Sequence, residues 1–166
     1  MAKFIKTVGT FSIMLLVVLL VAVRLVGFEP RDLQPGFWVN GDLVEEPVSD
    51  WSFTDNVEEI YVQTNTRYLI PHSVTTYCTV HNGTLYLFSA YYSGGTFPDE
   101  RSWNVNVMRD PRVRLKIGGQ LFDQNLRYID DAATRRPVHQ AFVDKYPQWN
   151  SPGIENVHIF AVDPAA

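Results

Sequence analysis

Residues 73–89, which read SVTTYCTVHNGTLYLFS, contain the pattern that decides the fold. Two runs of alternating residues meet at Asn82-Gly83. An Asn-Gly pair between such runs is the strongest short hairpin signal, because both central residues of a type I′ turn need a positive φ angle. The stretch therefore predicts a hairpin of two strands, over residues 73–80 and 84–91. On the first strand Val74, Thr76, Cys78 and Val80 share one face, and we interpret Cys78 as a core residue.

Further strands and two helices are predicted on both sides of this hairpin. Period-two alternation around Ile60 and Val62 predicts a strand that begins near Val57. Later strands are predicted over residues 112–117, 120–129 and 157–162, with Gly118-Gly119 as the turn between the first two. Helices are predicted over Pro98–Arg109 and from a cap at Asp130 or Asp131 to about Lys145.

The resulting order is β-β-β-α-β-β-α-β, in which hairpins dominate. This order predicts an α+β, mainly β fold with an antiparallel sheet or a small barrel, since a doubly wound sheet would alternate strands and helices throughout. Ahead of it, Asn40-Gly41 predicts a small hairpin of Phe37–Val39 with Asp42–Val44. We divide the chain into a membrane anchor (1–28), an acidic linker with this small hairpin (29–56) and the barrel domain (57–166).

The N-terminal segment is apolar enough to cross a membrane. Residues 7–23 form a run of 17 uncharged residues, followed by Arg24 and four more apolar or small residues. At 1.5 Å per residue a helix of this length spans about 30 Å of hydrocarbon, with Arg24 extending to the interface. We predict a single-pass anchor that contacts the bilayer through residues 4–28. A cleaved signal peptide and a buried helix are the alternatives.

The basic N-terminus, with Lys3 and Lys6, predicts a cytoplasmic N-terminus and a periplasmic or otherwise extracytoplasmic domain. Residues 29–166 hold all 18 acids and 11 of the 14 lysines and arginines, so their net charge is about −7. This charge argues against a nucleic-acid partner. The four histidines lack metal-ligand spacing, and Cys78 has no second cysteine to pair with. No metal site is therefore predicted.

One stretch, residues 89–103 (SAYYSGGTFPDERSW), contains candidate binding residues. It is predicted to leave a strand, pass through a Ser-Gly-Gly loop and enter a helix. Backbone N–H groups of such a loop, with an arginine nearby, can hold a phosphate, and the aromatic residues can stack on a flat ring. The alternative is a glycine-rich surface loop beside core aromatics.

Several motifs, in this order, resemble the split β-barrel flavin-binding superfamily. They are Thr64–Arg67, Pro71-His72, the hairpin Asn82–Ser89, Arg101–Asn104, Asp110–Leu115 and Gly118-Gly119. The superfamily includes the pyridoxamine-5′-phosphate-oxidase-like proteins and the deazaflavin-dependent nitroreductases. The resemblance covers residues 57–164, nearly the whole predicted domain.

The resemblance implies a six-stranded split barrel with two inserted helices, commonly a homodimer, that binds FMN or a deazaflavin. Carried over by position, Arg67, Ser89, Ser93 and Arg101 are implied to meet the cofactor phosphate. Tyr91, Tyr92 and Trp103 are implied to border the ring.

Three functions remain open at this point. The first is a membrane-tethered oxidoreductase that uses FMN or a deazaflavin. The second is a non-catalytic accessory or assembly subunit of a membrane complex that binds no cofactor and keeps the barrel. The third is a haem- or small-ligand-binding module in which His72 or His158 would serve.

Overall fold

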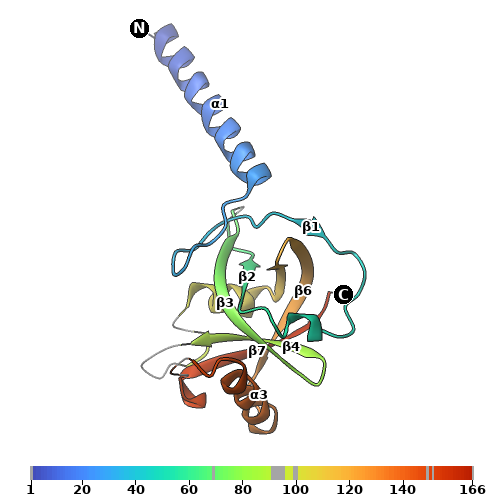
Figure 1. Ribbon diagram of the computed structural model, residues 1–166. Coiled ribbons are helices and arrows are strands. Elements are labelled where there is room, and N and C mark those ends of the chain that lie inside the picture. The colour runs from blue at the N-terminus through green and yellow to red at the C-terminus, as the bar shows by residue number, and fades with distance from the viewer. Residues whose placement is uncertain are drawn as a thin grey trace.

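The computed structural model describes residues 2–68, 70–90, 96–98, 101–148, 150 and 152–165. Six antiparallel strands form a barrel in the order β6-β5-β2-β3-β4-β7, and the pairing of β6 with β7 closes it (Figure 1). The strands are β2 (Glu59–Thr64), β3 (His72–His81), β4 (Thr84–Ala90), β5 (Arg112–Ile117), β6 (Gln120–Ile129) and β7 (Val157–Pro164). The predicted six-stranded barrel is confirmed.

The two predicted tight turns join β3 to β4 and β5 to β6. Asn82 and Gly83 have φ angles of 52° and 76°, and His81 pairs with Thr84 across them. These angles are those of a type I′ turn. Gly118 also has a positive φ, of 61°, and Ile117 pairs with Gln120 beyond it. Both hairpins follow from residues that tolerate the left-handed region.

The barrel interior is filled by the apolar residues of alternating strands. Ile60 and Val62 of β2 are buried, and so are Val113, Leu115 and Ile117 of β5. In β4 five consecutive residues are buried, because Leu85 and Leu87 face the barrel core while Tyr86 and Phe88 belong to a second cluster with helix α3. Strand β3 likewise buries Cys78 on one face and Ser73 and Thr79 on the other. Two-sided burial hides the alternation that a one-sided strand would show.

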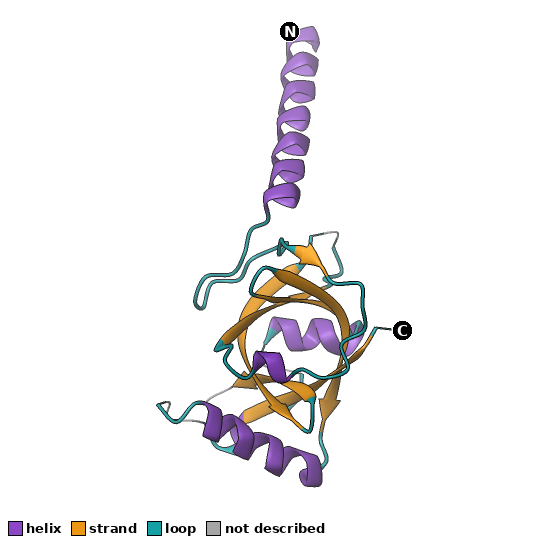
Figure 2. Ribbon diagram, turned by 45° about the vertical axis from the view of Figure 1, so that its right-hand side comes forward, coloured by secondary structure: helices purple, strands orange, loops and turns teal. Residues whose placement is uncertain are grey.

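The two inserted helices are α2 (Ser102–Arg109) and α3 (Ala132–Lys145). Helix α3 begins at the predicted cap, since the Asp131 carboxylate accepts from the Thr134 N–H at 2.8 Å. Helix α2 begins at Ser102, so the predicted start at Pro98 was too early. Pro98 precedes an extended Arg101, whose φ of −127° and ψ of 127° are not helical. Figure 2 shows the helices set against the strands of the barrel.

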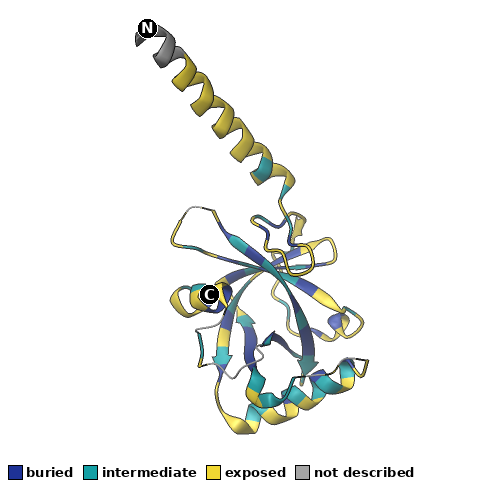
Figure 3. Ribbon diagram, turned by 90° about the vertical axis from the view of Figure 1, so that its left-hand side faces the viewer, coloured by how far each residue is buried: buried dark blue, intermediate teal, exposed yellow. Residues whose placement is uncertain are grey.

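The N-terminal helix α1 (Ala2–Val26) projects away from the barrel, at the end opposite α3 (Figures 1 and 3). Its segment Val8–Val26 is long and apolar enough to cross a membrane, and none of that segment is buried against the rest of the chain. The residues that follow α1 return to the barrel through a bridge between Gly36 and Ser73, a short strand and the 3₁₀ helix Ser52–Thr54, before β2 begins.

The predicted small hairpin over residues 37–44 was wrong. Strand β1 (Asp42–Leu43) pairs in parallel with Gln120–Leu121 at the start of β6. The residues before it pair with the chain that leaves α1, because the Phe37 N–H donates to the Phe28 carbonyl and the Phe28 N–H donates to the Trp38 carbonyl. The start of β6 offers β1 an edge that β7 does not cover, and the Phe28 backbone offers bonds to residues 37 and 38. These partners compete with the local Asn40-Gly41 turn.

Candidate functional site

A cavity of about 390 Å³ lies beside β3 and β4, with the start of α2 and Phe142 of α3 on its wall. The turn Asp32–Pro35, which follows α1, forms another part of its wall. Cavities that bind small molecules in proteins occupy roughly 300–1,000 Å³. The volume therefore suits a small organic ligand, and Phe88, Trp103 and Phe142 give the cavity apolar walls.

Three polar side chains that line this cavity carry buried atoms without a hydrogen-bond partner among the described residues. They are His72 (Nδ1), Thr75 (Oγ1) and Ser89 (Oγ). A buried polar atom left unpaired costs about 1–3 kcal/mol, so native proteins pair nearly all of them. Ser89 follows Leu87 on the face toward the barrel core and Thr75 precedes Tyr77 on the face toward α3, so the two hydroxyl groups border the cavity from opposite faces of the sheet. Unpaired hydroxyl groups on a cavity wall are typical of a site whose partner is a bound ligand.

Arg101 supplies a positive charge at this cavity. Its Nε and Nη2 atoms donate to the Ala90 carbonyl at 3.3 and 2.9 Å, which fixes the guanidinium group between the end of β4 and the start of α2. The first N–H groups of a helix lack intrahelical partners and carry the positive end of the helix dipole. Arg101 and the N-terminus of α2, with Ser102 on the cavity wall, therefore favour an anionic group at the same place.

His72 adds a neutral polar group. Its Nε2 lies 3.5 Å from the Ser102 hydroxyl, and burial lowers the pKa of the imidazole below its usual value of 6.5. Desolvation disfavours the charged form of a histidine. At neutral pH the imidazole therefore offers a hydrogen bond to a ligand and no charge.

The structure brings together part of the residue set predicted from the sequence. Ser89, Arg101 and Trp103 all line the cavity. Ser89 is 3% exposed, while most of Trp103 is buried against Phe160, at 5.0 Å between ring centroids. Arg67 is exposed and is not among the residues that line the cavity, so the structure separates it from the other candidates. Tyr91, Tyr92 and Ser93 lie outside the described residues.

Sequence reasoning did not select His72, Thr75 or Ser102 as phosphate or ring contacts, although Pro71-His72 belongs to the resembling motifs. For His72 and Thr75 the signal is the loss of hydrogen-bond partners on burial, and for Ser102 it is the position at the start of α2 on the cavity wall. A sequence displays neither. The turn Asp32–Pro35 was also missed, since it lies in the segment interpreted as a linker. Its Pro-rich composition, from Pro30 to Gly36, gives no sign that it closes a cavity.

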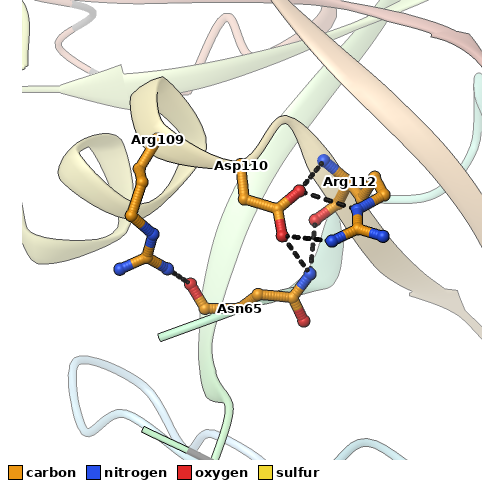
Figure 4. Close-up of polar contacts among 4 residues, drawn as sticks. All are labelled: Asn65, Arg109, Asp110 and Arg112. Carbon is orange, nitrogen blue, oxygen red and sulfur yellow. Dashed lines mark hydrogen bonds and ion pairs between the residues drawn. The ribbon is translucent and has the colours of Figure 1, made fainter. Parts of the chain in front are cut away.

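A second, shallower hollow is lined by charges that pair with one another. Asp110 accepts from the backbone and side chain of Arg112 and from Asn65, and Arg109 donates to the Asn65 carbonyl (Figure 4). Arg112 holds the pKa of the Asp110 carboxyl well below its usual range. Arg114 pairs with Asp123 in the same hollow. These mutual bonds hold the end of β2 to the start of β5 and leave little charge for a ligand.

Among the described residues, no group of three or more His, Cys, Asp or Glu side chains could hold a metal ion. Cys78 is fully buried, as predicted. His158 is also buried, and it lies 3.4 Å from the Tyr128 hydroxyl rather than on the wall of the cavity. The haem-binding alternative therefore keeps His72 alone as a residue that faces the cavity.

No protein-family model matches the chain, and no curated protein sequence matches it. Solved structures do match. A conserved hypothetical protein from Mycobacterium tuberculosis shares 14% identity over 78% of this chain and 86% of its own, with a TM-score of 0.55. A candidate 5-nitroimidazole antibiotic resistance protein from Bacteroides thetaiotaomicron shares 15% identity over 82% of this chain and 90% of its own, with a TM-score of 0.54.

A candidate pyridoxamine 5′-phosphate oxidase from Listeria innocua shares 14% identity over 69% of this chain and 90% of its own, with a TM-score of 0.50. At these identities the likeness concerns the fold. It agrees with the closed barrel of β2 to β7 and with the two helices inserted into it. The chain therefore has the split β-barrel fold of the pyridoxamine-5′-phosphate-oxidase-like and nitroimidazole-resistance proteins.

Proposed function

We propose that this protein is a membrane-tethered oxidoreductase that binds FMN or a deazaflavin in the cavity beside β3 and β4. The observation that carries the proposal is the meeting of Arg101, the N-terminus of α2 and the unpaired Ser89 hydroxyl at one cavity with apolar walls. A phosphorylated ring compound needs both a cation with N–H donors and an apolar surface.

Each residue has a defined task in this proposal. Arg101 and the first turn of α2 hold the phosphate, and a planar guanidinium suits two phosphate oxygens at once. The hydroxyls of Thr75 and Ser89 give hydrogen bonds that the described residues leave unfilled. The small part of Trp103 that stays accessible on the cavity wall borders the ring. The cofactor, when bound, supplies hydride transfer, while the protein binds it, orients it and excludes water.

The tether is part of the same proposal. Helix α1 is long and apolar enough to span a bilayer, and its segment Val8–Val26 buries nothing against the barrel. An exposed apolar surface of this size on a protein marks a site of contact with a membrane or another protein. We propose that α1 stays attached and holds the barrel at the membrane, with the N-terminus in the cytoplasm and the barrel outside.

The decisive experiment is a cofactor-binding measurement on the full chain purified in detergent. The protein is titrated separately with FMN and with a deazaflavin, and binding is followed by quenching of cofactor fluorescence. Saturable binding of one of them, lost in Arg101→Ala, is the expected result. A colourless protein that takes up neither would overturn the redox proposal.

That negative outcome would favour the accessory-subunit function. One observation supports this second candidate: among the described residues on the cavity wall, Arg101 is the single lysine or arginine. One guanidinium group carries a single positive charge and so neutralises only part of a phosphate dianion. Co-purification of the detergent-solubilised chain with a defined membrane complex, with no cofactor present, would support this function.

A further inference from the structure

Exposed apolar and aromatic side chains gather where α1 meets the barrel. Phe28 lies just after the end of α1, and Phe37, in the segment that pairs with it, contacts its ring, with ring centroids 5.3 Å apart. Tyr68 and Ile70 lie in the loop between β2 and β3, which points to the same end of the barrel as α1 (Figures 1 and 3). We name Phe28, Phe37, Tyr68 and Ile70 the collar. All four are exposed, and Tyr68 is 83% exposed.

The collar cannot lie far from the end of α1, because almost no free chain separates them. Gly27, with a φ of 83°, ends the helix, and the next residue already donates to the Trp38 carbonyl. The Asn40 side chain donates to the last helical carbonyls, Leu25 at 3.0 Å and Val26 at 3.5 Å. Helix α1 is therefore bonded to the chain that packs on the barrel.

That chain is in turn fixed to the strands. Gly36 exchanges backbone hydrogen bonds with Ser73 at the start of β3, and the Val39 N–H donates to the Gln63 side chain at 2.9 Å. A side chain at Gly36 would collide with the Phe28 carbonyl, so the close approach depends on glycine. Glu29 forms an ion pair with Lys116 of β5. These contacts leave no flexible linker between α1 and the barrel, so the barrel cannot move freely relative to the helix.

We propose that the collar inserts into the headgroup region of the bilayer that α1 crosses, so that the barrel rests against the membrane in one orientation. This inference rests on the proposed tether and adds a second contact to it. Tyrosine and other aromatic side chains favour the membrane interface, where one end of the ring is apolar and the other is hydrated. The collar places such rings beside the end of a spanning helix.

The attraction is apolar rather than electrostatic. Residues 29–166 have a net charge of about −7, which anionic lipids would repel. Arg31 and Arg67 flank the two loops of the collar and are exposed, so they reduce the repulsion locally. One consequence concerns the cavity, because its wall Asp32–Pro35 belongs to the same segment as Phe28 and Phe37. The Asp32–Pro35 side of the cavity would then be the part nearest the bilayer surface, and the Phe142 side the part farthest from it.

The test places a spin label at one of four sites in the full chain, reconstituted in vesicles of phosphatidylcholine and phosphatidylglycerol. The variants are Leu16→Cys in α1, Tyr68→Cys and Ile70→Cys in the collar, and Ala133→Cys on α3 at the opposite end of the barrel. The native Cys78 is fully buried and should take up no label. Labelling of the unsubstituted chain is the control for this. Each label is then exposed to oxygen, which enters lipid, and to a water-soluble nickel chelate.

We expect the label at position 16 to be accessible to oxygen and the label at position 133 to be accessible to the nickel chelate. The labels at positions 68 and 70 should both be much less accessible to the nickel chelate than the label at position 133. If Leu16 lies in lipid while Tyr68 and Ile70 are as open to nickel as Ala133, the collar contact is overturned and the tether stands. If Leu16 is itself open to nickel, both the tether and the collar contact are overturned.

Discussion

The guanidinium group of Arg101 donates to the backbone oxygen of Ala90, with the Nη2 atom at 2.9 Å and Nε at 3.3 Å. This contact joins the residue before α2 to the last residue of β4, and both residues line the cavity. It uses two of the five N–H bonds of the guanidinium group. The remaining donors are therefore available at the cavity wall, which Ser89 and Thr75 also line.

Replacing Arg101 should weaken cofactor binding. In Arg101→Ala the phosphate loses charge-assisted hydrogen bonds, each worth about 1.5–3 kcal/mol, so the dissociation constant should rise by at least about tenfold. Arg101→Lys should recover part of the loss, because lysine keeps the charge without the planar fork. Fluorescence titration with the cofactor measures both changes.

The matched control is Arg136→Ala, since Arg136 is exposed on α3 and does not line the cavity. It removes the same charge from the protein as a whole. If Arg136→Ala weakens binding as much as Arg101→Ala, the effect comes from net charge and Arg101 has no direct contact with the ligand.

Removing the Ser89 hydroxyl should separate stability from binding. This oxygen is buried and has no partner among the described residues, so Ser89→Ala relieves an unsatisfied group. The cofactor-free protein should then be as stable as before, or more stable by up to about 1 kcal/mol, while cofactor affinity falls. Urea unfolding and fluorescence titration in the same detergent measure the two quantities.

Thr54→Val is the opposite case. The Thr54 hydroxyl is fully buried, donates to the Trp51 carbonyl at 2.8 Å and lies away from the cavity. Its removal should lower stability by about 1 kcal/mol and leave binding unchanged. A Ser89→Ala protein that is destabilised like Thr54→Val, with full affinity, would assign Ser89 a structural role.

The strands and turns of the barrel could be predicted from the sequence where local residue preferences alone determine the structure. Asn82-Gly83 and Gly118 require positive φ angles, and β5 buries alternate residues, so register and turns follow from short stretches. The prediction of a hairpin over residues 37–44 was wrong because β1 pairs with β6. Asp42 is paired with Gln120, which lies 78 residues later in the sequence. Long-range strand pairing depends on the whole barrel, which no local window contains.

The site was readable only in part. Arg101 and Ser89 stood out because they border a turn and a helix start, where ligands commonly bind. Arg67 was implied by the resemblance alone, and it lies away from the cavity because tertiary contacts set the direction of the β2–β3 loop. Thr75 is one of several threonines on a strand, and only the folded barrel shows that its hydroxyl lacks a partner.

The Tyr146 hydroxyl should contribute strongly to stability. It lies 2.8 Å from the Cys78 carbonyl and 2.7 Å from the Glu58 carbonyl, and it accepts from the Cys78 N–H at 3.3 Å. Burial raises the pKa of this tyrosine, so it remains a neutral donor at any physiological pH. Tyr146→Phe leaves buried backbone groups unpaired and should lower the free energy of unfolding by about 1–3 kcal/mol.

Urea unfolding followed by circular dichroism measures this loss, with Tyr68→Phe as the control because the Tyr68 ring is exposed. The control should change stability by less than about 0.5 kcal/mol. Equal effects of the two substitutions would contradict the role assigned to the buried hydroxyl, and would mean that the contact between α3 and β3 is purely apolar.

His72 should make the cofactor-free protein less stable as the pH falls below about 6.5. Burial lowers the pKa of His72 in the folded protein, so between that lowered pKa and 6.5 the unfolded chain binds a proton that the folded chain does not. Stability therefore rises with pH through this window, and the contribution of His72 is fully present above it.

His72→Gln removes this contribution. The stability of the variant should therefore fall less than that of the unsubstituted protein between pH 7 and about 5.5. The other three histidines are common to both proteins and cancel in the comparison. Parallel losses in urea unfolding at the two pH values would show that the imidazole at the cavity is not kept neutral by burial.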